Sequence, residues 1–437
     1  MASLLARCGN LGVTRMRTIF HALLLLLISI RICRFVGAPT RLTDSLADVA
    51  NRGHLSAEHK GSRIFASATA GHRDVRVFVY NLPPKFNTLQ VARSHQQPAP
   101  IRDPYCDENF YSAEVSVHKG LLASPARTMN PAQADFFYVP IYVTCYLINN
   151  HPNNLTKTGM FFDEAMSHIV HKYTYFNTSH GRDHVYTFTQ GFGARLSGVN
   201  WKSWRNGIFL THNGDFTSEE YTPRKDIVIP PNLGHYITPV YVDKKRRESL
   251  ILERRRFLAQ FGGQAFSSKI SDHRGSNYSG GVRQYLASEL YDTAGFRITG
   301  TRSNAYLDDM RDSMFCLAPE GWHPWSPRPY YGILLGCIPV VLSERQELAF
   351  EDAIPYDELV VWVRPNDVFS LNEILRAIPA EEILKRLKLM ERIWSLFWYG
   401  EHRGGALSAI LGELSRHKYS SAPRRHYAMF VGPRRGK

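Results

Sequence analysis

The chain has few of the residues that build metal centres or disulfide-rich folds. It holds six cysteines in 437 residues, and no CxxC pair or His/Cys cluster among them has the spacing of metal ligands. A structural zinc site is therefore not expected. The basic residues are spread along the sequence and are not gathered in one helix, which argues against a nucleic-acid partner.

Acidic residues are missing from the start of the chain, and no apolar run there reaches the roughly 20 residues of a full membrane span. Before Asp44 there is no Asp or Glu, and the run "IFHALLLLLISI" covers residues 19–30. Arg31 and Arg34 can snorkel, so that the span continues beyond the run. We predict a signal anchor over residues 1–38, with a cleaved signal peptide and a plain buried helix as alternatives. Either of the first two places the body in the secretory lumen.

Two further features are compatible with that compartment. Glycosylation acceptor patterns occur at Asn154, Asn177 and Asn277. Two of the six cysteines precede or lie in the anchor, and the other four can pair in three ways that sequence does not distinguish: Cys106, Cys145, Cys316 and Cys337.

What is abundant is positive charge and apolar sequence. The 53 Lys and Arg exceed the 39 Asp and Glu by 14, and 44% of the residues are hydrophobic. A globular chain of this length fits two domains, and the charge favours anionic partners. Residues 39–73 are rich in Ala, Ser, Arg and His and predict a stem.

Short apolar strands alternate with helical patterns through the rest of the chain, which predicts the α/β class with parallel sheets. In the first half, strands are expected at residues 75–83, around Phe136 and at 184–190, 207–211 and 226–231, with a helix at 159–172. In the second half, strands are expected at 257–263, 315–319, 337–342 and 359–363, with helices at 280–290 and 379–399. We therefore predict one Rossmann-like domain over 74–245, a second over 246–400, and a basic tail over 401–437.

A loop between two of these strands holds the strongest functional signal, in "FCLAPEGWHPWSPRPYYGILLGCIPVVL". The carboxyl end of the first strand delivers Glu320, Gly321 and Trp322 to the edge of the sheet where ligands bind. Ser326 suits the N-cap of the helix that follows, and Arg328 lies in its first turn. A helix amino terminus beside an Arg favours a phosphate or a diphosphate.

This block resembles the signature of exostosin-type glycosyltransferases, family 47, which make cell-wall glycans in plants and algae and heparan sulfate in animals. The resemblance extends to "VRVFVYNLPPKFN", "QADFFYVPIY", "DHVYTFTQGFGA", "DIVIPP" and "FLAQFGG", over residues 75–398. It implies a GT-B architecture of two Rossmann-like domains facing a cleft, with the acceptor in the first and the nucleotide sugar in the second. It also implies inverting transfer, usually from a UDP-sugar, by a type II Golgi membrane protein, and a C-terminal helix that returns to the first domain, here assigned to 379–399.

Carried onto this chain, the resemblance implies that Gly262 and Gly263 let the backbone approach the donor phosphates. Arg283 and Arg328 would balance the diphosphate charge, so that no metal is obligatory, although a divalent metal is compatible with the reaction. A hetero-oligomer with a related glycosyltransferase is also compatible with the family.

Two positions depart from the family pattern. Tyr331 stands where relatives carry an acid for the ribose hydroxyls, and Gln190 stands in place of the His of a His-Asp pair. Inverting transfer needs a base within hydrogen-bond reach of the acceptor hydroxyl. We favour Asp215 for this role, with His184 and Gln190 as further candidates in the catalytic region; a turn function for Asp215 is the alternative.

Three functions from different classes fit the sequence. The first is an active glycosyltransferase that uses a nucleotide sugar and a glycan or glycoprotein acceptor. The second is an inactive family member that binds glycans or stabilises a partner, which the departures at Tyr331 and Gln190 motivate. The third is a basic binder of nucleic acid or membrane surfaces, which the charge of +14 motivates.

Overall fold

The computed structural model describes residues 64–97, 104–150, 154–245, 255–265, 278–301, 303–400 and 405–419. Contacts divide the chain into two units, residues 1–52 and 53–437, and all described residues belong to the second. The predicted anchor, most of the predicted stem and Asn277 lie outside the described residues. Within the described ranges, no helix has the length and apolar character needed to span a membrane.

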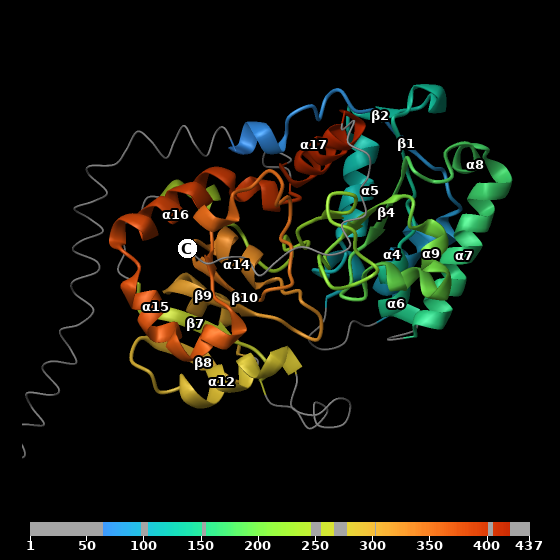
Figure 1. Ribbon diagram of the computed structural model, residues 1–437. Helices are drawn as coiled ribbons and strands as arrows, with labels where there is room; N and C mark the ends of the chain where they lie inside the picture. Colours follow the sequence, from blue (N-terminus) through green and yellow to red (C-terminus); the bar gives the residue numbers. More distant parts are fainter. Residues whose placement is uncertain are drawn as a thin grey trace, which may run out of the picture. The chain divides into compact units, whose positions relative to one another are not determined.

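The first half of the body is built around a parallel sheet of six strands in the order β2-β1-β3-β4-β5-β6. The strands are β1 (Val77–Val79), β2 (Arg127–Thr128), β3 (Phe136–Tyr138), β4 (His184–Phe188), β5 (Ile208–Thr211) and β6 (Ile227–Val228). The helices of this half include α4 (Thr88–Gln96), α5 (Ala113–Ala123), α6 (Val143–Asn150), α7 (Leu155–Lys172), α8 (Tyr175–Ser179) and α9 (Trp201–Trp204), which surround the sheet in green and teal (Figure 1).

These strands are rich in aromatic and β-branched residues. Their side chains are buried on both faces of the sheet, as expected for a parallel sheet that helices cover on both sides. Every residue of β3, β4, β5 and β6 is buried. Helix α7 turns Phe162, Ala165 and Ile169 toward the same core at three-to-four spacing. Gly159 lets α7 approach the next segment closely, because a Cβ there would lie 2.5 Å from the Cα of Gly198.

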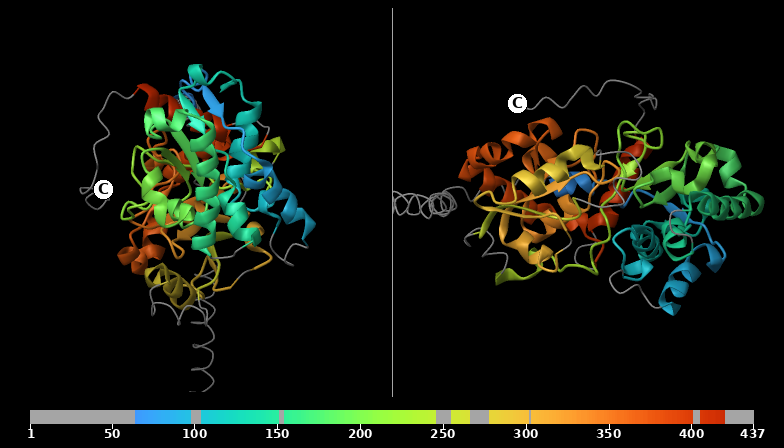
Figure 2. Two further views of the ribbon diagram at one scale, coloured as in Figure 1. Left: turned by 90° about the vertical axis from the view of Figure 1, so that its right-hand side faces the viewer. Right: turned by 90° about the horizontal axis from the view of Figure 1, so that it is seen from below.

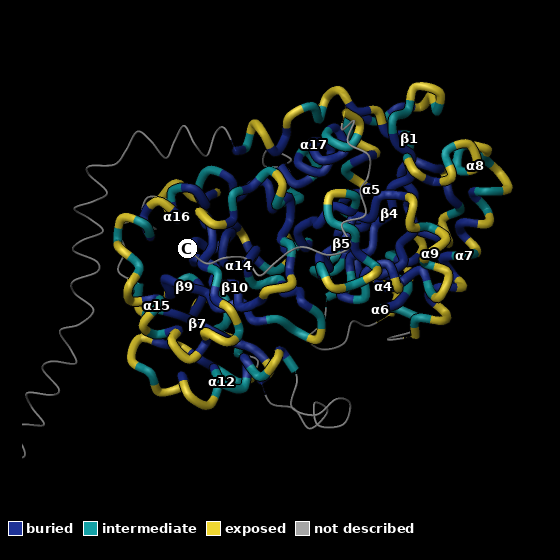
Figure 3. Tube along the Cα trace, in the orientation of Figure 1, coloured by how far each residue is buried: buried dark blue, intermediate teal, exposed yellow. Residues whose placement is uncertain are grey.

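The second half contains a parallel sheet of five strands in the order β11-β10-β9-β7-β8. Its strands are β7 (Phe257–Gly262), β8 (Phe296–Thr299), β9 (Ser313–Pro319), β10 (Ile338–Leu342) and β11 (Val361–Trp362). The helices are α12 (Val282–Glu289), α13 (Tyr306–Arg311), α14 (Arg328–Leu335), α15 (Leu371–Ala377) and α16 (Ala380–Ile393). Figure 2 gives two further views of this half in yellow and orange, and Figure 3 shows its central strands in the dark blue of buried residues.

Two parallel sheets with covering helices confirm the α/β class and are consistent with a GT-B-like fold. In the second sheet the chain runs from β7 outward to β8 and then returns to the other side of β7 for β9. The strand order therefore reverses between β7 and β9. Open α/β sheets bind ligands at the carboxyl ends of strands at such a reversal. The predicted domain boundaries around residue 245 stay a prediction.

The helix that returns to the first half is α17 (Gly405–Tyr419), which packs against α5. Its Gly412 is pressed against the chain before β1, since a Cβ there would lie 2.2 Å from the carbonyl oxygen of Ala68. Lys418 Nζ donates to the carbonyl of Asp74 over 3.1 Å. Figure 1 shows α17 in red beside α5 and the blue first residues.

This packing corrects three predictions from the sequence. Residues 64–73 are assigned above to the stem and 405–419 to the tail, but both segments are folded and contact one another. The segment 379–399 is assigned to the returning helix, whereas its helix α16 packs on β10 of the second sheet. Only the end of the segment reaches the first half, where the Tyr399 hydroxyl donates to the carbonyl of Pro230 over 3.0 Å. Leu407, Ile410, Leu411 and Leu414 of α17 lie at the three-to-four spacing of a helix face, so the sequence held a usable signal that the assignment to a basic tail passed over.

Both pairs among the four remaining cysteines are formed, Cys106 with Cys145 and Cys316 with Cys337. The second disulfide joins β9 to the residue before β10 and closes the connection that contains the tryptophan-rich loop and α14. A bond across a 21-residue separation restricts the unfolded chain by about 3 kcal/mol in the loop-entropy model. It therefore holds the predicted phosphate-binding segment against its two strands.

Glu114 on α5 has a buried carboxyl group that accepts hydrogen bonds from backbone N–H groups at the amino terminus of α6. Its two oxygens accept from the backbone N–H groups of Thr144 at 3.1 Å and Cys145 at 2.8 Å. Burial raises the pKa of Glu114 to about 8, although these hydrogen bonds act in the opposite direction. The native state therefore holds a proton on Glu114 at pH values where an unfolded chain has lost it.

The pKa of Glu114 predicts a fall in stability as pH rises from about 4.5 to about 8. Because only the native state keeps the proton in this window, its contribution decreases by at most about 1.4 kcal/mol per pH unit. We expect Glu114→Gln to flatten this part of the melting-temperature profile between pH 5 and pH 8. Parallel profiles for the two proteins would contradict the assignment.

Candidate active site

The predicted donor residues meet where the strand order of the second sheet reverses. Gly262 ends β7, and Gly263 follows it. β9 ends at Pro319, so Glu320 and Gly321 leave the neighbouring strand at the same edge. The fold thus brings together residues that lie nearly 60 positions apart in the sequence.

Arg328 is the first residue of α14 and reaches back to β7. Its Nη2 donates to the carbonyl of Gly262 over 2.9 Å, and its Nη1 donates to Ser326 Oγ over 3.2 Å. The backbone N–H of Arg328 also points at Ser326 Oγ, at 3.3 Å. The N-cap position is Pro327 and not Ser326 as predicted, because the helix begins at Arg328. The buried Nε of Arg328 has no hydrogen-bond partner within the described chain.

Arg283 enters the same place from the first turn of α12. It is 5% exposed, which excludes an ordinary surface position on its helix. Its Nε donates to the carbonyl of Glu320 over 2.7 Å, and its Nη1 donates to the hydroxyl of Tyr278 over 2.6 Å. Burial, and then the neighbouring charge of Arg328, lower the pKa of Arg283 to about 10.

The two guanidinium groups lie over one aromatic ring. The Phe261 ring centroid is 5.1 Å from Cζ of Arg328 and 5.8 Å from Cζ of Arg283. Neither cation forms an ion pair with a carboxylate in the parts of the chain that the structure describes. A buried cation, Arg283, and a partly buried one, Arg328, both satisfied mainly by neutral groups, make this edge of the sheet suited to an anion with two negative groups.

The two glycines after β7 are in contact with side chains of this site. A Cβ on Gly263 would lie 2.3 Å from Nη2 of Arg328, and one on Gly262 would lie 2.8 Å from Cδ2 of Tyr306. The glycines therefore let Arg328 and Tyr306 come against the strand end. Their predicted approach to donor phosphates stays a prediction.

The two tryptophans of the loop differ in environment. Trp325 is 6% exposed and stacks on His212 of the first half, with ring centroids 5.3 Å apart and planes 6° apart. Trp322 is 59% exposed and packs against Tyr278, the residue that Arg283 contacts. Trp325 thus joins the two halves, while Trp322 is open to solvent beside the cations.

Tyr331 is buried in α14 between tyrosines from both halves. Its ring lies edge-to-face against Tyr306 at 6.1 Å and against Tyr236 at 6.4 Å. No hydrogen bond of the Tyr331 hydroxyl is found within the described residues. The adjacent Tyr330 is different, because its hydroxyl accepts from the backbone N–H of Ala349 at 2.9 Å.

Backbone pairing joins the two halves beside this site. Phe216 N–H donates to the carbonyl of Arg345, and Glu347 N–H donates to the carbonyl of Gly214. Asp215 lies in the middle of this short antiparallel pairing, opposite Gln346.

The side chains at the pairing link Asp215 to the donor loop. Arg345 Nη2 lies 3.0 Å from Oε2 of Glu320, and its Nη1 lies 4.0 Å from Oδ2 of Asp215. Asp215 Oδ1 accepts from both the N–H and the hydroxyl of Thr217. Asp215 is therefore close to the donor loop, and one of its oxygens performs the turn function that was the alternative.

The loop after β4 also faces the donor loop. A Cβ on Gly191 would lie 2.9 Å from Cδ2 of His323, and the Phe192 and His323 rings are 5.4 Å apart. Gln190 supports this turn, because its Oε1 accepts from Phe192 N–H at 2.8 Å.

A family model for the Exostosin GT47 domain matches residues 71–378. The chain belongs to the exostosin GT47 family of glycosyltransferases. Similar proteins include a probable glucuronosyltransferase of Oryza sativa subsp. japonica, 32% identical over 72% of this chain and 71% of that protein. A probable beta-1,4-xylosyltransferase of Arabidopsis thaliana is 32% identical over 78% and 81% of the two chains. A probable glucuronosyltransferase of Physcomitrium patens is 32% identical over 78% and 75%.

The third catalytic candidate of this exostosin-family chain has different partners. His184 is fully buried at the start of β4, where Asp183 Oδ1 lies 2.7 Å from Nδ1 and the Tyr80 hydroxyl lies 2.7 Å from Nε2. Its ring also stacks on Phe137 of the hydrophobic core. No contact of His184 with the donor loop is found among the described residues.

The sequence analysis of this exostosin-family chain did not identify Tyr278, Tyr306 and Arg345 as site residues. Arg345 had a usable signal, because it follows β10 by three positions at the ligand-binding edge of the sheet. Tyr278 and Tyr306 follow no strand directly, so only the tertiary structure brings them to the cations.

Neighbouring tyrosines on α14 offer a test of the donor side. We expect Tyr331→Phe to keep the stability of the protein and to weaken UDP binding by a few-fold, because a hydroxyl without a protein partner is available to the ligand. Tyr330→Phe leaves the Ala349 N–H unsatisfied and should lower stability by about 1–3 kcal/mol with UDP affinity unchanged. Melting temperatures and titration calorimetry measure both quantities, and the reverse pattern would exclude Tyr331 from the donor site.

Proposed function

We propose that this chain transfers a sugar from a nucleotide diphosphate sugar, a UDP-sugar as the family suggests, to a glycan or glycoprotein acceptor. The observation that carries the proposal is the pair of cations, the buried Arg283 and the partly buried Arg328, held over Phe261 at the strand reversal. A diphosphate leaving group is the anion that two adjacent guanidiniums match in charge and in hydrogen-bond donors.

In the proposed step, the acceptor hydroxyl oxygen attacks the anomeric carbon from the side opposite the diphosphate. The new C–O bond forms as the bond to the phosphate oxygen breaks, and the electron pair leaves with the nucleoside diphosphate. This in-line displacement inverts the anomeric configuration. Arg283 and Arg328 stabilise the negative charge that develops on the leaving group.

The acceptor proton has to pass to a base in the first half. Asp215 is a carboxylate linked to the donor loop through the Arg345 guanidinium that it shares with Glu320. Its Oδ2 accepts no hydrogen bond from Thr217, since both bonds end on Oδ1. We propose Oδ2 of Asp215 as the proton acceptor.

We propose the donor sugar and the acceptor only as chemical classes. The similar proteins are named for glucuronosyl and for xylosyl transfer, so the donor comes from the hexuronosyl or pentosyl class without a choice between them. A polysaccharide or a glycoprotein glycan fits as the acceptor, and the reaction belongs to the Golgi lumen, with a type II anchor at residues 1–38. Asn154 and Asn177 are exposed, as glycosylated residues must be.

A second function is favoured by one observation. Asp215 faces a guanidinium and binds Thr217, while His184 is buried between Asp183 and Tyr80. Both Asp215 and His184 therefore have other partners in the described structure. An inactive family member that binds a nucleotide sugar or a glycan and stabilises a related glycosyltransferase fits this arrangement.

A donor panel with two arginine variants separates these functions. We expect the purified body, residues 53–437, to release the nucleoside diphosphate from one donor. Arg328→Ala should reduce the rate by about 100-fold or more, since it removes a charge that stabilises the leaving group. Arg93→Ala, an exposed position on α4, is the matched control. If donors bind and no diphosphate is released, the chain is an inactive family member and the proposed transfer reaction is wrong.

The cation pair also predicts how the reaction depends on metal. Because Arg283 and Arg328 supply the positive charge, we expect the transfer rate to change by less than about threefold when EDTA is added. Loss of activity with EDTA and recovery with Mg²⁺ or Mn²⁺ would show that the cations do not suffice.

A further inference from the structure

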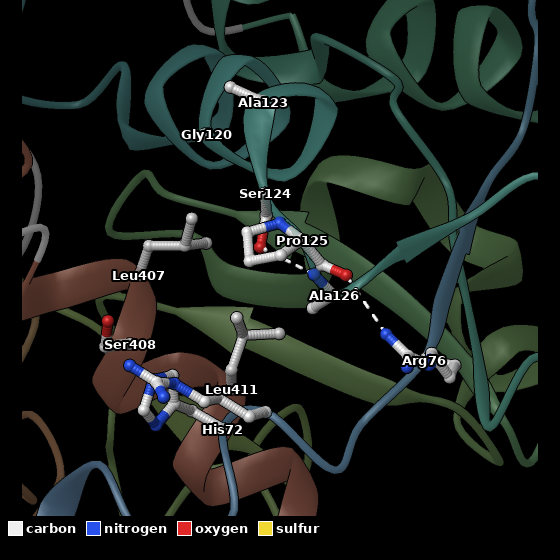
Figure 4. Close-up of a pocket in the computed structure, with 11 residues that line it drawn as sticks. His72, Arg76, Gly120, Ala123, Ser124, Pro125, Ala126, Leu407, Ser408 and Leu411 are labelled. Carbon is white, nitrogen blue, oxygen red and sulfur yellow. Dashed lines mark hydrogen bonds between the residues drawn. The ribbon is translucent and has the colours of Figure 1, made fainter.

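A second concave site lies at the far end of α5, away from the donor loop. It is a cavity of about 540 Å³ between the end of α5, the first residues before β1, and α17. Figure 4 shows Leu407 and Leu411 of α17 facing Pro125, with His72 and Arg76 at the side. Its volume is in the range of sites that hold small ligands or single sugar units.

The charged side chains that line the cavity are all basic. His72, Arg73 and Arg76 line it, and none of the eleven lining residues is acidic. Arg73 is exposed, and no hydrogen bond or ion pair of its guanidinium is found within the described residues. Arg76 uses Nη1 for the carbonyl of Pro125 at 3.1 Å, and His72 places Nδ1 2.6 Å from the carbonyl of Thr69. These two side chains are thus held in place with other nitrogens to spare.

The rest of the lining is aliphatic with hydroxyl groups. Leu407, Leu411 and Pro125 supply carbon surface, and Ser124 and Ser408 supply hydroxyls. A sugar ring presents carbon-bound hydrogens on its faces and hydroxyls at its rim, so this mixture matches it. The cations add selectivity for a sugar that carries a carboxylate or a sulfate.

Helix α5 connects the cavity to the donor loop. The residues before its amino end, Phe110 and Tyr111, lie against Trp325, with ring centroids 6.1 and 5.2 Å away. Its other end, Ala123, lines the cavity. A helix of 11 residues is about 16 Å long at 1.5 Å per residue. The cavity and the donor loop therefore lie near opposite ends of α5, about this length apart.

We infer that this cavity, lined by His72, Arg73, Arg76 and Ser408, binds an acidic sugar unit of the glycan, a few units away from the reacting end. The inference rests on the proposed function for the statement that the glycan is the acceptor. A lipid headgroup would use the cations as well, but it gives no role to the hydroxyls and carbon surface that line the site. The cavity therefore favours acidic chains over neutral ones.

Binding without a donor tests this site independently of transfer. We would titrate the luminal body with oligomers of glucuronic acid, with glucose oligomers of equal length, and with phosphatidylserine vesicles. The variants are Arg73→Gln, which removes an exposed charge, and Ser408→Phe, which fills the cavity and keeps all its cations. Arg93→Gln, with the same loss of charge elsewhere, is the control.

We expect glucuronate oligomers to bind more tightly than glucose oligomers. Arg73→Gln should weaken that binding roughly fivefold, Ser408→Phe should abolish it, and Arg93→Gln should leave it unchanged. The inference is overturned if neither oligomer binds, if binding survives Ser408→Phe, or if the vesicles alone bind and respond to the variants. Diphosphate release from the donor is measured in the same proteins. A failure of the proposed transfer reaction is therefore distinguished from a failure of glycan binding at the cavity.

Discussion

The site depends on two neighbouring arginines, Arg283 and Arg328, whose guanidinium groups both lie over the ring of Phe261. Like charges at this distance repel, and burial adds to the cost. Backbone carbonyls of Gly262 and Glu320, the Tyr278 hydroxyl and the Phe261 ring offset that cost. An anion between the guanidiniums would offset it further. The sheet reversal, the helix start at Arg328 and the Cys316–Cys337 disulfide all serve to keep this pair in place.

The second constraint is the junction between the two sheets. Gly214 and Phe216 pair with the chain at 345–347, and Trp325 stacks on His212. Burial lowers the pKa of His212 to about 3, so it packs as a neutral ring. Because Arg345 contacts both Glu320 and Asp215, a shift of the donor loop moves the surroundings of the proposed base. This arrangement couples the donor side to the acceptor side through a few residues.

Much of the fold and part of the candidate site could be predicted from the sequence. The strand before the loop and the helix start beside Arg328 follow from local rules, because apolar runs and Pro act over a few positions, whereas the N-cap falls on Pro327 and not on Ser326. The partners of Arg283 could not be predicted, because Tyr278 and Glu320 reach it only through the sheet order. The same holds for residues 64–73, which carry no strong pattern alone and pack against α17. Asp215 lies beyond the end of β5 at Thr211, and its bonds to Thr217 depend on the turn that follows, which local patterns do not define.

The central claim is that Arg283 and Arg328 together hold a diphosphate. The most direct measurement compares the affinities of UDP, UMP and uridine by calorimetry in the natural protein and in the Arg283→Gln, Arg328→Gln double variant. The account predicts that UDP binds much more tightly than uridine in the natural protein, and that this difference nearly disappears in a folded double variant. An unchanged difference between UDP and uridine would show that the phosphates lie elsewhere, and the account of the site would be wrong.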